Sequence, residues 1–185
     1  HRPRFGDRTI AELRGVIEEG GHSPFWNALA GRFFDMSFPE ADGFNAMHGT
    51  QFIADLMPKT PIYVELLDQR ARDVIGQPHP SGRGALKMLE EEGFVYDRYI
   101  DIFDGGPTVT ARTDDIRTVR EAEELRVVAI GEGGTEPALL AAGRLTGFRA
   151  CKGLVTRADD GLTIDAETAA LLEIAAGDAV LAAPL

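Results

Sequence analysis

The chain has 185 residues, 30 of them acidic and 19 basic, so its formal net charge is -11. This balance argues against a general nucleic-acid-binding protein, which needs a basic face. No apolar run reaches ~18 residues, so we predict no membrane-spanning helix. The single cysteine, Cys151, excludes an intrachain disulfide and a cysteine zinc cluster. A reducing, cytoplasmic location is the expectation that follows.

The first residues, His1-Arg2-Pro3-Arg4, contain neither a methionine nor a signal-peptide pattern. A strand is predicted almost at once, from Thr9. We therefore expect this sequence to be part of a longer protein.

The first strand and the first helix are predicted from local patterns. Residues 9–17 alternate loosely between apolar and polar side chains, which indicates a strand. Ser23-Pro24 indicates a helix start, because serine caps a helix and proline fits its first turn. Apolar residues then recur at helical spacing as far as Phe34, and we expect Trp26 and Phe33 to pack on the sheet.

The sequence from residue 35 to residue 111 predicts more helices and a hairpin. Residues 35–47 are expected to be irregular. Gly93 is expected to end the helix that begins at Ala85. The two strands around Asp104-Gly105-Gly106-Pro107 should form a hairpin beside the strand at residues 9–17. The expected helices are residues 50–56, 62–75 (one helix or two short ones) and 85–93, and the expected hairpin strands are residues 95–103 and 108–111.

The pattern of residues changes after Thr113, and this change predicts an α/β C-terminal extension over residues 113–185. Its first segment is highly charged, and Asp159-Asp160-Gly161 marks a turn. The expected helices are residues 114–124 and 164–176, the second starting near Asp165, and the expected strands are residues 125–130, 149–156 and 179–182.

His79 is the residue most suited to proton transfer. It stands between Pro78 and Pro80, and prolines stiffen the backbone on both sides of it. A histidine on a rigid loop just before a helix suits proton donation or abstraction near neutral pH. A turn histidine with a structural hydrogen bond fits the same spacing, so both interpretations remain open at this point.

The other reactive side chains form no recognisable motif. His22 and His48 fit roles in turns, and the histidines show no metal-ligand spacing, so no metal is expected. Cys151 has no neighbouring base in the sequence and is expected to be a buried structural thiol. We find no nucleophile elbow and no Walker or Rossmann glycine loop.

Several longer segments carry a more specific signal, namely residues 12–15, 23–26, 52–63, 73–80, 99–108, 148–150 and 176–178. Together they resemble the arginine N-succinyltransferase family, and the resemblance covers nearly the whole chain. The segment from Ala85 to Phe94, which leads into a strand, is also similar to the closing part of the GNAT acyltransferase fold.

The resemblance implies an α/β (α+β) fold, with a GNAT-like mixed sheet and flanking helices. Residues 1–112 would be the C-terminal half of a GNAT-like acyltransferase unit, with residues 113–185 packed on it. The glycine-rich turn that holds the pyrophosphate of the acyl-CoA in this family is not found here. We therefore expect the missing N-terminal half or another subunit to be needed, in a homo- or hetero-oligomer.

The implied reaction moves a succinyl group from succinyl-CoA, a co-substrate, to the α-amine of L-arginine, in arginine catabolism. No tightly bound cofactor is implied. The amine attacks the thioester directly, and the resemblance gives His79 the role of proton donor to the leaving sulfur. Glu12 and Asp55 are candidates to bind the guanidinium, and Arg83 to pair with the succinyl carboxylate. Ordinary surface salt bridges and a solvated arginine are the alternatives for these three residues.

A different class of function also remains open. A GNAT-like scaffold without its CoA loop would suit a non-catalytic module that binds an amino acid or a partner subunit. Within the enzyme class, ornithine is an alternative acceptor, because it differs from arginine only at its cationic end.

Overall fold

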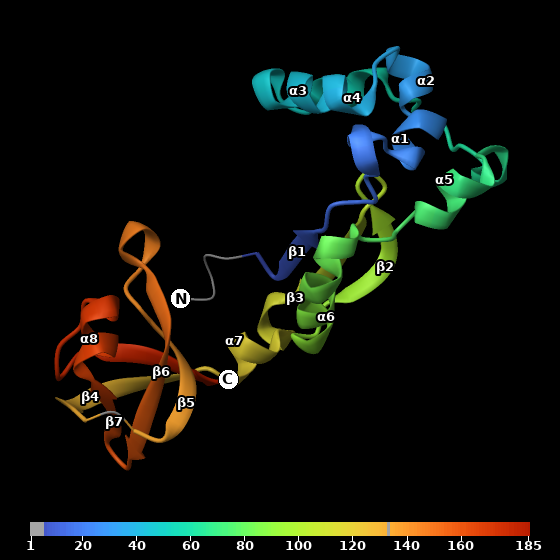
Figure 1. Cartoon of the computed structure of the whole chain (residues 1–185). Helices are drawn as coiled ribbons and strands as arrows, with labels where there is room; N and C mark the ends of the chain where they lie inside the picture. The colour runs from blue at the N-terminus through green and yellow to red at the C-terminus, as the bar shows by residue number, and fades with distance from the viewer. Residues whose placement is uncertain (1–5, 133) are drawn as a thin grey trace. The chain divides into compact units, whose positions relative to one another are not determined.

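The computed structural model describes residues 6–132 and 134–185. The chain divides after Thr113 into two compact units, each described here by itself (Figure 1). Helices and strands occur in both units, so the prediction of a mixed α+β protein is confirmed. Among the described residues, no helix combines the length and the apolar character that crossing a membrane requires.

The first unit contains an antiparallel sheet with the order β1-β3-β2 (Figure 1). Its strands are β1 (Arg8–Glu12), β2 (Val95–Ile100) and β3 (Pro107–Arg112). The central strand β3 buries Val109 and Ala111, the residues of one face. The expected hairpin and its pairing with the first strand are confirmed, although β1 ends at Glu12 and not at Ile17.

The expected helix after Ser23 is two short helices, α1 (Pro24–Ala28) and α2 (Gly31–Phe34). Ser23 caps α1 as predicted, accepting a hydrogen bond from the Trp26 amide at 3.1 Å. The helix breaks because Leu29 leaves helical geometry at φ -116° and ψ -81°. Trp26 is fully buried, as expected, but the predicted burial of Phe33 is wrong, since that side chain is 47% exposed.

Residues 35–47 are not irregular, contrary to the prediction, because α3 (Phe38–His48) occupies most of them. The local cause is a capping box: Ser37 accepts from the Glu40 amide, and the Glu40 carboxylate accepts from the Ser37 amide at 2.8 Å. The expected short helix at residues 50–56 is confirmed as α4 (Gln51–Leu56).

The helices predicted for residues 62–75 and 85–93 are confirmed, whereas the 3-10 helices at residues 19–21 and 80–82 lie where no helix was expected. The segment 62–75 contains two short helices, and α6 ends before Gly93, which has φ 97°. These elements are the 3-10 helices η2 (Glu19–Gly21), η3 (Val64–Leu66) and η4 (Pro80–Gly82), and the helices α5 (Gln69–Val74) and α6 (Arg83–Glu91).

Trp26 is the centre of an aromatic core that joins the helices to the turn between β2 and β3. Its ring centroid lies 5.3 Å from that of Phe34, 6.1 Å from Phe38 and 5.1 Å from Phe103. The indole N–H donates to the Met36 carbonyl at 2.9 Å, so the polar atom of the buried ring is satisfied. The core therefore fixes Phe103, and with it the turn before β3.

The second unit is a closed five-stranded barrel with the order β4-β7-β6-β5-β8. Val127, Leu140 and Leu162 are fully buried in its core. Its elements are β4 (Glu123–Gly131), β5 (Glu136–Ala142), β6 (Arg149–Ala158), β7 (Gly161–Asp165) and β8 (Ala179–Pro184), with η5 (Thr113–Asp115), α7 (Arg117–Glu121), η6 (Leu145–Gly147) and α8 (Ala166–Leu172).

Two of these strands were not predicted. β5 lies where no element was expected, and β7 takes Ile164 from the expected helix because it pairs with both β4 and β6. The expected helix starts after Asp165 but stops at Leu172, where Glu173 is left-handed at φ 57°. The α-helix of the charged segment is confined to residues 117–121, with the short 3-10 helix η5 before it, since residues 123–124 already belong to β4.

Candidate active site

The His79 loop is attached to the segment that follows β1. The His79 amide donates to the Arg14 carbonyl at 2.7 Å, and Pro78 forms an isolated antiparallel bridge with Gly15. The carbonyl of the same residue, His79, accepts from the Gly82 amide at 2.8 Å, where η4 leads into α6. The histidine backbone is therefore fixed on both sides, as the flanking prolines predicted.

The His79 imidazole is fixed through its Nδ1 atom. Nδ1 accepts from the Ser81 amide at 3.3 Å and lies 2.7 Å from the Ser81 hydroxyl oxygen. Because a backbone amide only donates, Nδ1 carries no proton in this arrangement, and the proton of the neutral ring is on Nε2. The side chain is partly exposed, so Nε2 is the ring nitrogen suited to meet a substrate.

A buried carboxylate, Asp104, organises the backbone next to this loop. Its Oδ2 accepts from the Gly15 amide at 2.8 Å and its Oδ1 from the Gly106 amide at 2.8 Å. Asp104 is only 6% exposed. Burial raises the pKa of Asp104 above its usual range, and the two amide hydrogen bonds oppose that rise. The carboxylate thus bridges the turn before β3 to the residue that pairs with Pro78.

Two glycines permit this approach of backbones. A Cβ added at Gly15 would lie 2.8 Å from the Gly106 nitrogen and against the carbonyl of Asp104. A Cβ at Gly106 would lie 2.5 Å from the Gly15 nitrogen and against the carbonyl of Leu13. Since every one of these neighbours is backbone, a side chain at either position would force the two segments apart.

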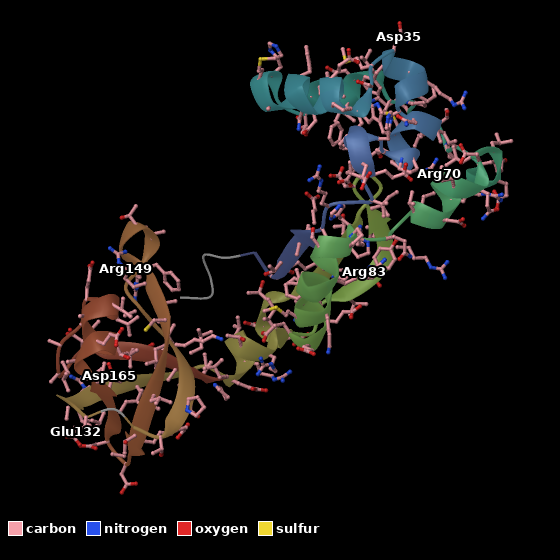
Figure 2. The ribbon with its side chains drawn as sticks, in the orientation of Figure 1. Asp35, Arg70, Arg83, Glu132, Arg149 and Asp165 are labelled. Carbon is pink, nitrogen blue, oxygen red and sulfur yellow. The ribbon has the colours of Figure 1, made fainter. Side chains whose placement is uncertain are left out.

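The structure brings three of the four predicted site residues to neighbouring segments. Glu12 is the exposed last residue of β1, two residues before the carbonyl that binds His79. Arg83 is exposed at the start of α6, four residues after His79 (Figure 2). Asp55 lies apart from this group on α4, where its carboxylate accepts from the Gln51 side chain at 2.8 Å. The substrate-binding roles of these three residues stay predictions.

Sequence reasoning did not identify Asp104 or Ser81 as functional residues. Asp104 lies in the segment that was interpreted only as the turn of the hairpin, and no role was predicted for Ser81. The Asp-Gly-Gly-Pro run was the available signal for Asp104. Its partner Gly15 is 89 residues away in the sequence, so only the fold shows the contact.

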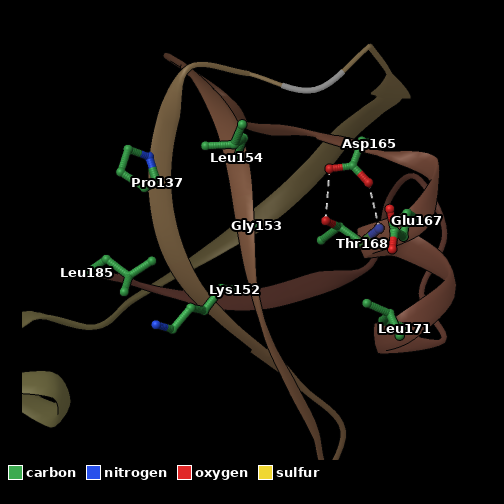
Figure 3. Close-up of a pocket in the computed structure, with 9 residues that line it drawn as sticks. All are labelled: Pro137, Lys152, Gly153, Leu154, Asp165, Glu167, Thr168, Leu171 and Leu185. Carbon is green, nitrogen blue, oxygen red and sulfur yellow. Dashed lines mark hydrogen bonds between the residues drawn. The ribbon is translucent and has the colours of Figure 1, made fainter.

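Two hollows of the described surface lie elsewhere. One, of about 340 Å³, lies on the barrel, where Asp165 caps α8 by accepting from the Thr168 amide at 2.6 Å (Figure 3). The other, of about 200 Å³, lies beside the ion pair of Arg70 and Glu18. Among residues 6–132 and 134–185, no cluster of His, Cys, Asp or Glu is suited to hold a metal ion. Cys151 is half-buried against the barrel core, and burial raises the pKa of its thiol.

Asp104 is expected to give the protein a pH-dependent stability. Because its pKa is raised in the folded state above the usual 3.8, the folded state holds a proton that the unfolded state has lost. The free energy of unfolding should therefore fall as the pH rises from about 3.8 through the folded pKa of Asp104. Urea unfolding across this range should show a smaller fall for Asp104→Asn. Asp73→Asn, at an exposed site on α5, is the control and should keep the wild-type slope; an equal slope in Asp104→Asn would contradict the prediction.

Comparisons with known proteins identify the family. The family model described as arginine N-succinyltransferase beta subunit matches residues 1–118, and the model of the C-terminal domain of that subunit matches residues 123–184. The arginine N-succinyltransferase subunit beta of Pseudomonas aeruginosa is 44% identical over 186 residues, which cover 100% of this chain and 54% of that protein. The arginine N-succinyltransferase of Escherichia coli strain 55989 is 45% identical over 184 residues, with 97% and 53% covered.

A solved structure agrees with these relatives. The arginine/ornithine succinyltransferase subunit AI of Pseudomonas aeruginosa matches with a TM-score of 0.87 and 35% identity, and the match covers 100% of this chain and 53% of that one. The chain thus spans about half the length of the relatives it matches. Because both family models and these relatives agree over nearly all its residues, the chain belongs to the arginine N-succinyltransferase beta subunit family.

Proposed function

We propose that this chain forms part of an acyltransferase that moves the succinyl group of succinyl-CoA to the α-amine of L-arginine. The names of its relatives support this reaction and a partner subunit. We also propose that residues 1–112 are the C-terminal half of a GNAT-like unit and that residues 113–185 are its extension. The antiparallel sheet β1-β3-β2 and its neighbouring helices support a GNAT-like arrangement.

The observation that carries the proposal is the fixed position of His79. Its backbone is bound to Arg14 and its ring is bound through Nδ1, so Nε2 is the ring nitrogen that these contacts leave for a substrate. In the reaction, the neutral α-amine attacks the thioester carbon and the C–S bond then breaks. His79 in its protonated form donates the Nε2 proton to the leaving thiolate.

The proton balance closes within one catalytic cycle. The attacking nitrogen loses one proton as the amide forms, and the leaving sulfur gains one. The imidazole that gives one proton to the sulfur can therefore recover one from the attacking nitrogen, and no covalent intermediate with the enzyme is needed. Glu12 is proposed to face the guanidinium of arginine, and Arg83 the succinyl carboxylate, because opposite charges attract and form charge-assisted hydrogen bonds. Asp55, which lies apart from them on α4, is the other proposed partner of the guanidinium.

A thiol-release assay with succinyl-CoA tests this function. The enzyme assembled from this chain and the remaining half of the relatives' length should release thiol only when arginine is added. Ornithine, supplied in a parallel arm, tests the choice of acceptor. Binding of either amino acid without thiol release would instead favour the non-catalytic module.

The chain by itself is expected to be inactive and not to behave as a stable monomer. Its sheet exposes large apolar side chains, with Ile10 62%, Val95 56% and Tyr99 66% exposed, and such surfaces associate in water. Sedimentation should therefore show association or incomplete folding of the isolated 185-residue chain. A well-behaved monomer, or thiol release by the chain alone, would contradict this expectation.

A further inference from the structure

We infer that Ser81 is a positioning residue for His79, holding the imidazole by Nδ1 so that Nε2 transfers the proton. This inference deepens the proposed function and rests on it. The Ser81 hydroxyl oxygen lies 2.7 Å from Nδ1, which is a normal distance for a hydrogen bond of a hydroxyl group. The second contact, from the Ser81 amide, is longer at 3.3 Å.

The hydroxyl group is the partner that suits both states of the ring. A hydroxyl both donates and accepts, whereas the Ser81 amide only donates. When the ring is neutral with its proton on Nε2, the hydroxyl donates to Nδ1. When the ring is protonated, the Nδ1–H group donates to the hydroxyl oxygen, and it still does so just after Nε2 has given up its proton, because the remaining proton is then on Nδ1. The same side chain can thus hold the ring in one orientation before and after Nε2 gives up its proton.

The surroundings of the loop leave this role to Ser81. The His79 backbone is bound by Arg14 and Gly82, but these contacts fix only the main chain and leave the ring free to rotate about χ1 and χ2. Among the described residues, both hydrogen bonds of the imidazole end on Ser81. The orientation of the ring therefore depends on this one residue of the loop.

The kinetic test uses three substitutions in the complete enzyme. Ser81→Ala removes the hydroxyl and keeps the amide, so kcat should fall roughly three- to tenfold while KM for both substrates changes less than about twofold. Ser81→Thr keeps the hydroxyl and should restore kcat to within about twofold of the original. Ser37→Ala removes the hydroxyl of the serine that caps α3 and should leave kcat unchanged.

A spectroscopic test separates this inference from the proposed function. With histidine labelled by ¹⁵N, the neutral His79 ring should show a protonated Nε2 and an unprotonated Nδ1. Ser81→Ala keeps the amide and so should keep this tautomer, but the Nδ1 signal should shift because the hydrogen bond to the hydroxyl is lost. The His79 signals are assigned by their loss in His79→Ala. If His79→Ala kept full turnover, the proposed proton donor would be wrong, while a shifted Nδ1 signal in Ser81→Ala would still show that the Ser81 hydroxyl holds the ring. Unchanged kcat together with unchanged ring signals in Ser81→Ala would overturn the inference.

Discussion

Replacing His79 by alanine in the complete enzyme is expected to lower kcat by about 10²- to 10⁴-fold, the usual contribution of general acid catalysis. KM for succinyl-CoA and arginine should change much less, because the proton is needed only once the C–S bond is breaking. His79→Gln should recover little activity, since an amide offers a hydrogen bond but no transferable proton. Steady-state thiol release at several concentrations of each substrate separates kcat from KM.

The stability of the His79→Ala variant is the control for this measurement. The backbone contacts of the loop, from the residue 79 amide to the Arg14 carbonyl and from the Gly82 amide to the residue 79 carbonyl, do not involve the imidazole. Thermal unfolding should therefore change little. Near-normal turnover with an unchanged pH dependence would make His79 a turn histidine and would remove the central support for the proposed reaction.

Gly106→Ala is expected to have the largest effect on stability among single-atom additions near the site. The new Cβ would lie 2.5 Å from the Gly15 nitrogen and against the Leu13 carbonyl, both of them backbone. Separating the segments also stretches the hydrogen bonds from the Gly15 and Gly106 amides to the buried Asp104. Overpacking alone costs about 1–3 kcal/mol, and a lost buried hydrogen bond adds about 1–3 kcal/mol. Urea unfolding of the complete enzyme measures the sum.

Gly43→Ala provides the matched control for this substitution. Gly43 lies inside α3, and a Cβ added there meets no atom within 4 Å. The same change should therefore stabilise the protein by about 0.5–1 kcal/mol, because alanine is the better helix former. Equal effects of the two substitutions would show that the two backbones separate without cost. Gly15, Asp104 and Gly106 would then not form a clamp that holds the segments together.

Gly106→Ala should also affect turnover, because the clamp lies next to the His79 loop. Gly15 pairs with Pro78, and the Arg14 carbonyl accepts from the His79 amide at 2.7 Å. A displaced Gly15 would move this attachment point and so misplace the imidazole. Loss of kcat beyond what the loss of folded enzyme explains is the expected result.

The sequence alone determined the elements whose signals are local. Ser23-Pro24 begins α1, Gly93 ends α6, and the glycine-rich run after Asp104 turns the chain into β3. The prolines around His79 also indicated a fixed loop correctly. These features were predictable because the capping, the turn and the restricted φ each depend on residues within a few positions of one another. The capping box of Ser37 and Glu40 was equally local, and α3 could have been predicted from it.

Only the tertiary structure decided the features that depend on distant residues. The strands β5 and β7 exist because the barrel closes around them, and each pairs with strands from elsewhere in the chain. The break between α1 and α2 lets Trp26 and Phe34 share one aromatic core. Asp104 becomes a buried clamp only when Gly15, 89 residues earlier, is brought to it. Local propensity does not predict such contacts, because their free energy arises from burial and hydrogen bonding between segments that meet only in the fold.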